Sequence, residues 1–583
     1  MIWYIGIDIG NTGISAVLFN KENQEIHPIY WLNRANENQQ ETSFRLPGVG
    51  FARILPGTEI DPSTTSIFVG YLAEKLAEMY PGLFVQKFKQ YLQTAIPYYS
   101  PRMNSWQPLV KWSTQKHLSL YFFSRTLQEL LGIFKAAKQS ESVVSVAAYG
   151  LDEETFNNVI NNLTGVILSY PLGWGDTYQF NLREAVLTAK LVEKPQQIFF
   201  ISDGLATILS RLDEIQNGVN SDASFFKGGL VVINAGDITT EMGLVELPDN
   251  WQKLSLNNMM IHSFPYGGNS LDQDILCQML LQDDKGRFKQ EILAPLGFNL
   301  PLSELPQPGE LDIEKRDRLQ QLLNNSELGK ILLQAATYLK LILEYKLEVP
   351  LEIDDFEWVC NRSQLQQKVI LPYIKRLNRE LNVLLSYTPV GTQGINQIIV
   401  TGGTSGLKEF KEWLEQKFTN AVIIQDNYKD GGLKTCSRVA HGLAILPMYP
   451  QLLERSQQQY SDYFLLWELL QVVTIKGNDI SEILQLLERR GINTRICKER
   501  ILGFLDGQMP KGLIPTLNYP QLLHQSAWQN LDYQVLTGDE IFIKEEDNLY
   551  RINNIQQEHL IRYLSTLYSG TLQKISEPLI LEL

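Results

Sequence analysis

The segment IGIDIGNTG, Ile5–Gly13, decides how the chain is interpreted, because it places one carboxylate, Asp8, inside an otherwise apolar stretch. Side chains alternate between the two faces of a β-strand, so Asp8 points away from the isoleucines beside it. Asn11-Thr12-Gly13 then predicts a tight turn into a second apolar strand, since Asn and Gly tolerate positive φ. We therefore expect Asp8 to face a polar environment.

Two interpretations of this turn stay open on the motif alone. Successive N–H groups in a turn can form a concavity that binds anions. A carboxylate beside it would suit a hydrated Mg²⁺ that arrives with a phosphate, because Mg²⁺ prefers oxygen ligands and keeps several waters. The alternative is an ordinary hairpin in which neighbouring groups satisfy Asp8.

Length and composition limit the class of protein. A chain of 583 residues is too long for one hydrophobic core and suggests roughly three to four structural units. The formal charge of −14 argues against general binding to nucleic acids or anionic membranes. The four cysteines are widely spaced, and no stretch approaches eighteen apolar residues, so we expect neither a signal peptide nor a membrane span. We expect a soluble, cytoplasmic protein with reduced cysteines.

The opening pattern occurs a second time in GGLVVINAGDITTEMGLVEL, Gly228–Leu247, with Asn234 at the polar position. The two polar positions lie 234 − 8 = 226 residues apart, which predicts two similar lobes rather than a short repeat. Each lobe also has a later strand that leads into a helix, at Gly165–Pro171 and at Ile395–Gly406. The predicted fold class is α/β, duplicated.

Gly402 and Gly403 follow the later strand of the second lobe. They would place bare backbone near a helix N-terminus, where a phosphate or a nucleoside can pack closely. Glycine turns are common between strands and helices, so this motif is weak alone. The order of several such positions along the chain is more informative than any one motif. These positions are Asp8, Pro171, Asp203, Asn234 and Gly402.

This order resembles the ATPase superfamily of actin, sugar kinases and heat-shock chaperones, and most closely the seventy-kilodalton heat-shock chaperones, over about Ile2 to Pro447. IGIDIGNTG is similar to the family's first phosphate loop, NAGDITTE to its second, and IIVTGGTSGLKEF to its adenosine loop. Three further stretches are similar to those that carry the catalytic lysine, the switch proline and the helix after the second loop; they are FVGYLAEKLAEMYPGLFVQKFKQYL, VILSYPLGWGD and FPYGGNSLDQDIL. The resemblance implies a two-lobed actin-like ATPase fold built from duplicated RNase H-like domains.

The resemblance also implies the ligands and the residues that hold them. ATP or ADP would bind with Mg²⁺, and Asp8 and Asn234 would hold the metal through its waters. The implied catalytic positions are Lys87, Asp203, Asn234, Thr239 and Glu241. The implied nucleotide-binding positions are Asp8, Gly10, Asn11, Thr12, Gly13, Gly236, Asp237, Thr239, Gly268, Lys340, Gly402, Gly403 and Thr404.

Departures from the family pattern weaken the expected catalysis. Asn234 stands where the family has Asp, and Asn cannot accept a proton, so general-base help worth ~100-fold or more would be lost. The family's Glu-Pro pair falls on Asp203-Gly204, and its adenine-clamping Glu falls on Thr337. Its stacking arginines fall on Leu341 and Gly406, which cannot stack on a base. We expect nucleotide binding with slow or absent hydrolysis.

Each position also has a simpler explanation that does not need a ligand. Lys87 would be a solvated charge on a surface helix, and Pro171 would end a strand. Asp203-Gly204 would be a helix N-cap or a turn. The histidines show no catalytic spacing, and none is assigned a role.

The C-terminal residues differ from the family, because helices with one hairpin replace its strand-built substrate domain. Three helices followed by a hairpin are compatible with a winged helix, but acidic residues dilute the basic ones, so we prefer a protein-docking module to DNA binding. The predicted domains are residues 1–225 with a peripheral part at about 40–140, residues 226–450 with a peripheral part at about 280–360, and a separate module at 451–583. The Gln-rich stretch Gln457–Gln459 would be the linker.

The leading functional prediction is a chaperone-like, nucleotide-binding switch that acts on a partner protein and is at most a slow ATPase. An actin-like filament or scaffold is the first alternative. A small-molecule kinase of the same superfamily is the second, and Asn234 counts against it because such kinases need a carboxylate base.

Overall fold

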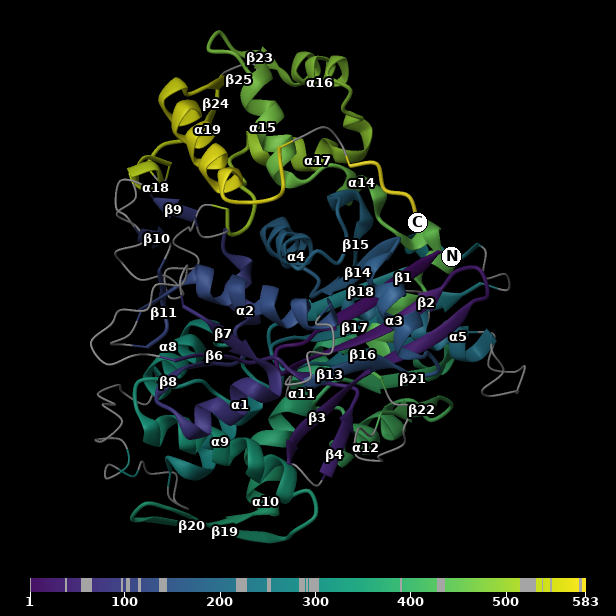
Figure 1. The fold of residues 1–583 in the computed structure, drawn as a ribbon, viewed down its shortest axis with the longest axis vertical. Helices are drawn as coiled ribbons and strands as arrows, with labels where there is room; N and C mark the ends of the chain where they lie inside the picture. Colours follow the sequence, from purple (N-terminus) through teal and green to yellow (C-terminus); the bar gives the residue numbers. More distant parts are fainter. Residues whose placement is uncertain are drawn as a thin grey trace. The chain divides into compact units, whose positions relative to one another are not determined.

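The computed structural model describes the chain except for residues 1, 37–38, 54–64, 96–97, 101–104, 108, 114–116, 136–143, 217–227, 249–252, 283–288, 290–291, 293–303, 388–390, 427–435, 514–530, 537, 546–547 and 576–578. The fold is mixed α/β and forms two compact units (Figure 1). Unit 1 comprises Met1–Val110, Leu118–Ile201 and Leu443–Leu583, and unit 2 comprises Lys111–His117 and Ser202–Gly442. No helix in the described part is both long and apolar enough to cross a membrane.

The main sheet of unit 1 has the strand order β13-β3-β2-β1-β14-β15. These strands are β1 (Trp3–Ile9), β2 (Gly13–Asn20), β3 (Glu25–Asn36), β13 (Val144–Ala148), β14 (Gly165–Tyr170) and β15 (Ile198–Ser202). β1 pairs antiparallel with β2 and parallel with β14. Every residue of β2 and β14 is buried, as expected for strands that are covered on both faces.

The sheet of unit 2 has the order β18-β17-β16-β21-β22, which repeats the order β3-β2-β1-β14-β15 of unit 1. Its strands are β16 (Gly228–Ala235), β17 (Thr240–Leu247), β18 (Met259–Phe264), β21 (Ile395–Thr401) and β22 (Val422–Gln425). The register repeats as well, because Asp8 lies opposite Ser15 and Asn234 lies opposite Glu241, and 241 − 15 is again 226. The two strand–turn–strand pairs predicted from the sequence are therefore present.

The helices of unit 1 alternate with its strands along the chain. They are α1 (Gly70–Met79), α2 (Leu120–Gly132), α3 (Glu153–Asn161) and α4 (Asp176–Thr188). A small sheet of β6 (Gly50–Arg53), β7 (Ile67–Val69) and β8 (Gly82–Val85) belongs to the predicted peripheral part. α4 is buried along most of its length, including polar residues such as Gln179, so it is covered on more than one side.

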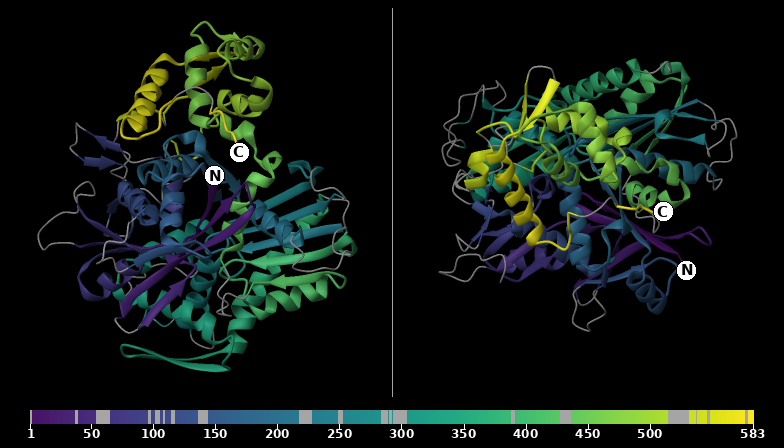
Figure 2. Two further views of the ribbon diagram at one scale, coloured as in Figure 1. Left: turned by 45° about the vertical axis from the view of Figure 1, so that its right-hand side comes forward. Right: turned by 90° about the horizontal axis from the view of Figure 1, so that it is seen from above.

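Unit 2 begins earlier than predicted, at Ser202 rather than near residue 226, so α5 (Asp203–Gln216) belongs to it. Its other main helices are α6 (Gly268–Ile275), α8 (Ile313–Leu323), α9 (Glu327–Ile342), α11 (Leu371–Ser386), α12 (Lys408–Lys417) and α13 (Arg438–Ala444). The hairpin of β19 (Glu348–Ile353) and β20 (Phe356–Asn361) projects from these helices (Figure 2).

The C-terminal residues are mainly helical with a hairpin, as predicted. The helices are α14 (Arg455–Gln459), α15 (Asp462–Val472), α16 (Ile480–Arg489), α17 (Thr494–Leu505), α18 (Leu531–Leu536) and α19 (Asn554–Ser569), and β23 (Asn478–Asp479), β24 (Phe542–Lys544) and β25 (Leu549–Ile552) form a small sheet. They do not form a separate unit, however, because they share a core with Phe180 of α4 and with Ala95. The predicted boundary near residue 451 is not a boundary between compact units.

The expected linker is also part of this packing. Gln458 in α14 is buried, and its side chain accepts a hydrogen bond from the N–H of Phe200 at 2.9 Å and donates one to the C=O of Phe200 at 2.6 Å. The amide of Gln458 thus satisfies both backbone groups of one residue of the strand β15. The prediction of an unanchored linker here is wrong, because a side-chain amide can pair with a strand in a way that composition does not reveal.

Candidate functional site

The turn between β1 and β2 is closed by a hydrogen bond of 3.0 Å from the N–H of Gly10 to the C=O of Gly13. No residue of the turn has positive φ, so this part of the prediction is wrong. Backbone atoms limit the space instead: a Cβ atom on Gly10 would lie 2.9 Å from the C=O oxygen of Gly13, and one on Gly13 would lie 2.8 Å from the C=O oxygen of Leu46. The same Cβ atoms would lie 2.7 Å from Nη2 and Nε of Arg45, respectively. Close approach therefore explains both glycines.

The segment that carries Lys87 contacts this turn. The N–H of Lys89 donates to Oδ1 of the buried Asn11 at 3.3 Å. Lys87 is half-buried and lies in a bend with φ of 52°, not on a surface helix. The expected surface helix at Lys87 is therefore wrong, although the side chain is still partly exposed, and the segment that carries it contacts the turn after Asp8.

The turn between β16 and β17 has the same closure as the first turn. The N–H of Gly236 donates to the C=O of Thr239 at 3.0 Å, and both residues are 226 positions after Gly10 and Gly13. Asn234 lies opposite Glu241 in β17 and opposite Thr401 in β21. Side chains at opposed positions share one face of a sheet, so these three polar residues form one row at the end of the strands.

Two further backbone segments meet the second turn. The N–H groups of Gly268 and Asn269 donate to the C=O groups of Gly236 and Asp237, each at 2.9 Å. Thr404 donates to the C=O of Ala235 through Oγ1 at 2.9 Å. Three segments that are distant in the sequence therefore converge in unit 2.

Gly268 lies where the predicted nucleotide-binding residues of unit 2 meet. A Cβ atom on Gly268 would lie 3.1 Å from Cγ2 of Thr404, 3.2 Å from Oδ1 of Asp237 and 3.6 Å from Nζ of Lys340. The fold thus brings together four residues that are separated in the sequence, namely Asp237, Gly268, Lys340 and Thr404.

Gly402 and Gly403 have different structural requirements. Gly402 has a φ of 98°, and a Cβ atom there would lie 2.3 Å from the backbone oxygen of Ala235, so only glycine fits. A Cβ atom on Gly403 would meet no atom within 4 Å. Gly403 therefore borders open space and can be substituted without a clash.

Asp203 is the first residue of α5 but does not cap it. Ser202 provides the cap, because its Oγ accepts the N–H of Leu205 at 3.2 Å, so the N-cap explanation of Asp203 is wrong. Asp203 is 8% exposed, and its Oδ1 has no hydrogen-bond partner among the residues that the structure describes. A buried carboxylate oxygen without a partner is costly, so a ligand, a cation or a water is expected there.

Glu241 is held beside the start of α5. Its Oε2 accepts the N–H of Gly204 at 2.7 Å, and the side chain is buried. Proline, which the sequence resemblance implies at position 204, has no N–H, so glycine there supplies the donor that this carboxylate uses. The positive end of the helix dipole also favours the charge of Glu241 at this place.

Lys340 has a partner that the sequence does not suggest. Its Nζ lies 2.6 Å from Oδ1 of Asp272, and Thr337 donates to the other oxygen of Asp272 at 2.8 Å. Asp272 is 1% exposed, so the three side chains form a buried polar cluster. Leu341 is 44% exposed and joins none of this cluster. Lys340 thus lies near the other predicted residues, but the carboxylate of Asp272 neutralises much of its charge.

A second buried polar cluster includes Asp274 of α6 and lies next to the turn between β16 and β17. Arg316 Nη2 lies 3.0 Å from Oδ1 of Asp274, and the hydroxyl of Tyr266 donates to the same carboxylate. Burial raises the pKa of Asp274 to about 6, although the Arg316 guanidinium acts in the opposite direction. The C=O of Tyr266 accepts Oγ1 of Thr240 at 2.7 Å, so this cluster is tied to β17 next to the turn.

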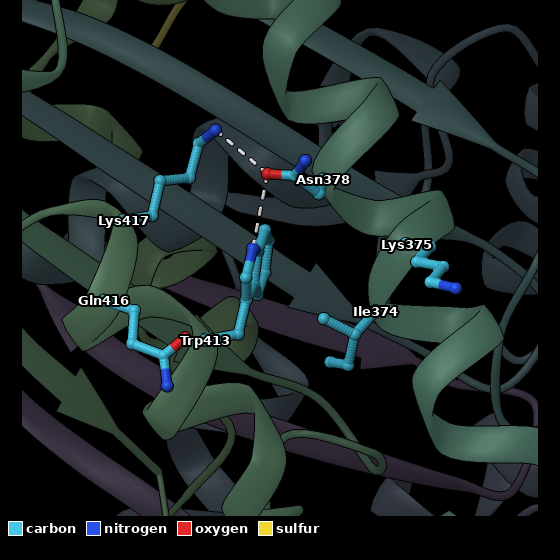
Figure 3. A pocket seen from close by; sticks show the side chains of 6 residues that line it. All are labelled: Ile374, Lys375, Asn378, Trp413, Gln416 and Lys417. Carbon is cyan, nitrogen blue, oxygen red and sulfur yellow. Dashed lines mark hydrogen bonds between the residues drawn. The ribbon is translucent and has the colours of Figure 1, made fainter. Parts of the chain in front are cut away.

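Unit 2 also has a surface hollow of about 270 Å³ between α11 and α12, which Figure 3 shows. Its lining residues are Ile374, Lys375, Asn378, Trp413, Gln416 and Lys417. Trp413 Nε1 and Lys417 Nζ both donate to Oδ1 of Asn378, at 3.3 Å and 2.9 Å, and burial lowers the pKa of Lys417. None of the predicted site residues lines this hollow.

Two residues near the predicted positions were missed by the sequence analysis, Arg45 and Asp272. Arg45 reaches the first turn because β5 (Leu46–Pro47) pairs with β2 at Ile14 and Gly13. Asp272 lies four residues after Gly268 on α6, so both residues are on one side of the helix. This spacing could have identified Asp272 from the sequence.

A comparison with protein-family models finds no family that matches the chain. A comparison with curated proteins finds no similar sequence.

Proposed function

We propose that the chain binds Mg-ATP in the manner of the actin and heat-shock ATPase superfamily, and that it acts as a nucleotide-dependent switch on a partner protein with slow or absent hydrolysis. The observation that supports nucleotide binding is the convergence in unit 2 of the turn Gly236–Thr239, the start of α6 and the turn Gly402–Thr404. Backbone N–H groups at turns and helix N-termini suit phosphates, and glycine lets a nucleoside approach the backbone.

The repeated strand order supports the two-lobed, duplicated form of this fold. Both sheets have a first strand that pairs antiparallel with the second and parallel with the fourth. The turns after β1 and β16 also close with the same hydrogen bond, from the first to the fourth residue of the turn. A duplicated sheet with a duplicated turn is the arrangement that the superfamily resemblance implies.

The roles of individual residues follow from their chemistry. Asp8 in unit 1 would bind Mg²⁺ through waters, and Asn234 would do the same in unit 2, because Mg²⁺ prefers oxygen ligands and keeps several of its waters. The cation would neutralise phosphate charge. Lys87 would neutralise the terminal phosphate, and the unpartnered oxygen of Asp203 would orient a water.

The switch would act through α4, which follows Pro171 in unit 1. Thr177 of α4 shares a buried hydrogen bond of 2.8 Å with the hydroxyl of Tyr463 in α15. Gln179 of the same helix is 4% exposed, so this polar side chain also lies within the packing around α4. We therefore place the C-terminal helices of the same chain, rather than an external protein, as the first element that responds to α4.

Substitution Gly403→Leu is expected to weaken ATP binding at least tenfold without loss of stability. A Cβ atom at position 403 meets no atom within 4 Å, so the new side chain would start in open space and occupy the position of the proposed nucleoside. Calorimetric titration with ATP and thermal unfolding would be measured together. Gly391→Leu is the matched control, since a Cβ atom there also meets nothing within 4 Å. Unchanged affinity in Gly403→Leu, or no ATP binding by the unmodified chain up to millimolar concentrations, would contradict the proposal.

Substitution Asn234→Asp is expected to raise ATP turnover by roughly ten- to a hundredfold, because the carboxylate restores a proton acceptor. Phosphate release under saturating Mg-ATP is the measurement. Asn157→Asp on α3 is the control, since that residue is exposed and far along the chain from the turns. A fast rate in the unmodified chain that Lys87→Ala abolishes would show instead that another carboxylate already serves as the base.

A further inference from the structure

The side chain of Arg45 lies over the turn Gly10–Gly13 in unit 1. Its Nη2 donates to Oγ1 of Thr12 at 3.0 Å. The absence of a Cβ atom at Gly10 and at Gly13 leaves the space that the guanidinium and its stem occupy. The side chain of Arg45 therefore packs against the backbone of the turn.

The backbone beneath this side chain is also fixed. The C=O of Arg45 accepts the hydroxyl of Ser43 at 2.9 Å and the hydroxyl of Tyr71 at 3.0 Å. The next two residues pair with β2, Leu46 with Ile14 and Pro47 with Gly13. The guanidinium is thus carried by a short, anchored segment that belongs to the same sheet as the turn.

The charge of Arg45 has no acidic partner among the side chains that the structure describes. The residue is exposed, and no carboxylate among the described residues lies within ion-pair distance of it. In a chain of net charge −14, a guanidinium without an acidic partner beside a turn of backbone N–H groups is a local anion-binding arrangement. A guanidinium has five N–H donors in a planar fork, and the bond to Thr12 uses one of them, so donors remain for an oxyanion.

We propose that Arg45 is a phosphate ligand that binds the terminal phosphates of a nucleoside triphosphate at the β1–β2 turn. The inference rests on the proposed function for the identity of the nucleotide. The fork of Arg45 and the N–H groups of the turn would hold the same phosphate, which carries more negative charge and more acceptor oxygens than a carboxylate. A free polyphosphate offers the same chemistry, and the experiment below separates the two sources.

The test compares Arg45→Gln with the unmodified chain by calorimetric titration with ATP, ADP, adenosine and inorganic tripolyphosphate. We expect Arg45→Gln to bind ATP and tripolyphosphate about ten- to a hundredfold more weakly, since charge-assisted hydrogen bonds to phosphate are lost. The loss for ADP should be smaller, and adenosine should be unaffected. Arg45→Lys should lie between the two, because it keeps the charge but not the fork.

Two variants separate phosphate binding from support of the turn. Arg53→Gln is the matched control, since Arg53 is exposed at the end of β6 and stacks on Tyr80 at 4.6 Å from the ring centroid. Tyr71→Phe removes the hydroxyl that donates to the C=O of Arg45 but leaves the guanidinium, so it should weaken ATP binding much less than Arg45→Gln. An equal loss in Tyr71→Phe, or a loss for adenosine as large as for ATP, would overturn the phosphate role and indicate a structural one.

The outcomes also distinguish this inference from the proposed function. If the unmodified chain binds ATP and Arg45→Gln binds it equally well, the inference about Arg45 fails and the proposed function stands. If the unmodified chain binds tripolyphosphate through Arg45 but binds ATP no better, Arg45 is a phosphate ligand and the nucleotide proposal fails. Binding of neither ligand would overturn both.

Discussion

A chain that ends at Pro450 is expected to be insoluble or strongly destabilised, because the C-terminal residues complete the core of unit 1. Phe180 of α4 lies in one buried cluster with side chains of α15, α17 and α19, including Tyr463 and Leu466. Burial of one large apolar side chain contributes about 1.5–3 kcal/mol, and the deletion would expose the face of α4 that now carries Phe180. An exposed apolar patch of this kind promotes aggregation.

Polar contacts lead to the same expectation. Glu184 of α4 accepts the N–H of Leu572 at 2.8 Å, and Arg183 donates to Oε1 of Gln573 at 3.2 Å. Burial raises the pKa of Glu184, and hydrogen bonds from Leu572 and Gln573 act in the opposite direction. The deletion would remove these donors from a carboxylate that they now satisfy. Soluble yield and thermal unfolding of residues 1–450 and of the full chain are the measurements. A soluble, monomeric shortened chain with an unchanged melting temperature would contradict the shared core.

A pair of glycines in the same C-terminal segment gives a finer control. Gly512 and Gly507 both have left-handed φ, 78° and 87°, so alanine carries a similar backbone strain at each. Only at Gly512 would a Cβ atom meet another element, the backbone oxygen of Gln93 at 1.8 Å. Gly512→Ala should therefore lower the melting temperature more than Gly507→Ala, and the difference reports the docking of this segment on the rest of unit 1.

Substitution Gly442→Ala is expected to lower the free energy of unfolding of unit 2 by about 3 kcal/mol or more, since added groups in a packed contact force the backbone apart. Gly442 lies in α13, and a Cβ atom there would lie 1.7 Å from the backbone oxygen of Ala206 in α5. Neither atom belongs to a flexible side chain, so the two helices must separate. Alanine favours an isolated helix over glycine by about 1 kcal/mol, so any loss of stability is steric.

Urea unfolding followed by circular dichroism would measure this loss. Gly406→Ala is the control, because a Cβ atom at Gly406 meets nothing within 4 Å in the same unit. The start of α5 carries Asp203 and Gly204, so separation of the helices should also loosen the hydrogen bond from Gly204 to Glu241. Equal stability of Gly442→Ala and the unmodified chain would show that α5 and α13 do not pack this closely.

The sequence alone was sufficient for the features that repeat or alternate locally. Alternation of polar and apolar residues predicted β1 and β2 around Asp8, and the spacing of 226 predicted the corresponding strands around Asn234. Glycine at Gly402 was also informative, because a residue with a φ of 98° against another backbone has to be glycine. These features depend on neighbours along the chain, which a pattern in the sequence records directly.

Contacts between distant segments were decided only by the tertiary structure. The pairing of β5 with β2 brings Arg45 to the first turn, and packing of α6 against α9 brings Asp272 to Lys340. Composition suggested a linker at Gln458, yet its side chain pairs with Phe200, 258 residues earlier. A single side-chain hydrogen bond over such a separation has no period and no fixed spacing. The partner of such a side chain depends on where the sheets and helices place the two residues. The sequence by itself therefore determined the repeated turns, whereas the tertiary structure decided which groups surround these turns.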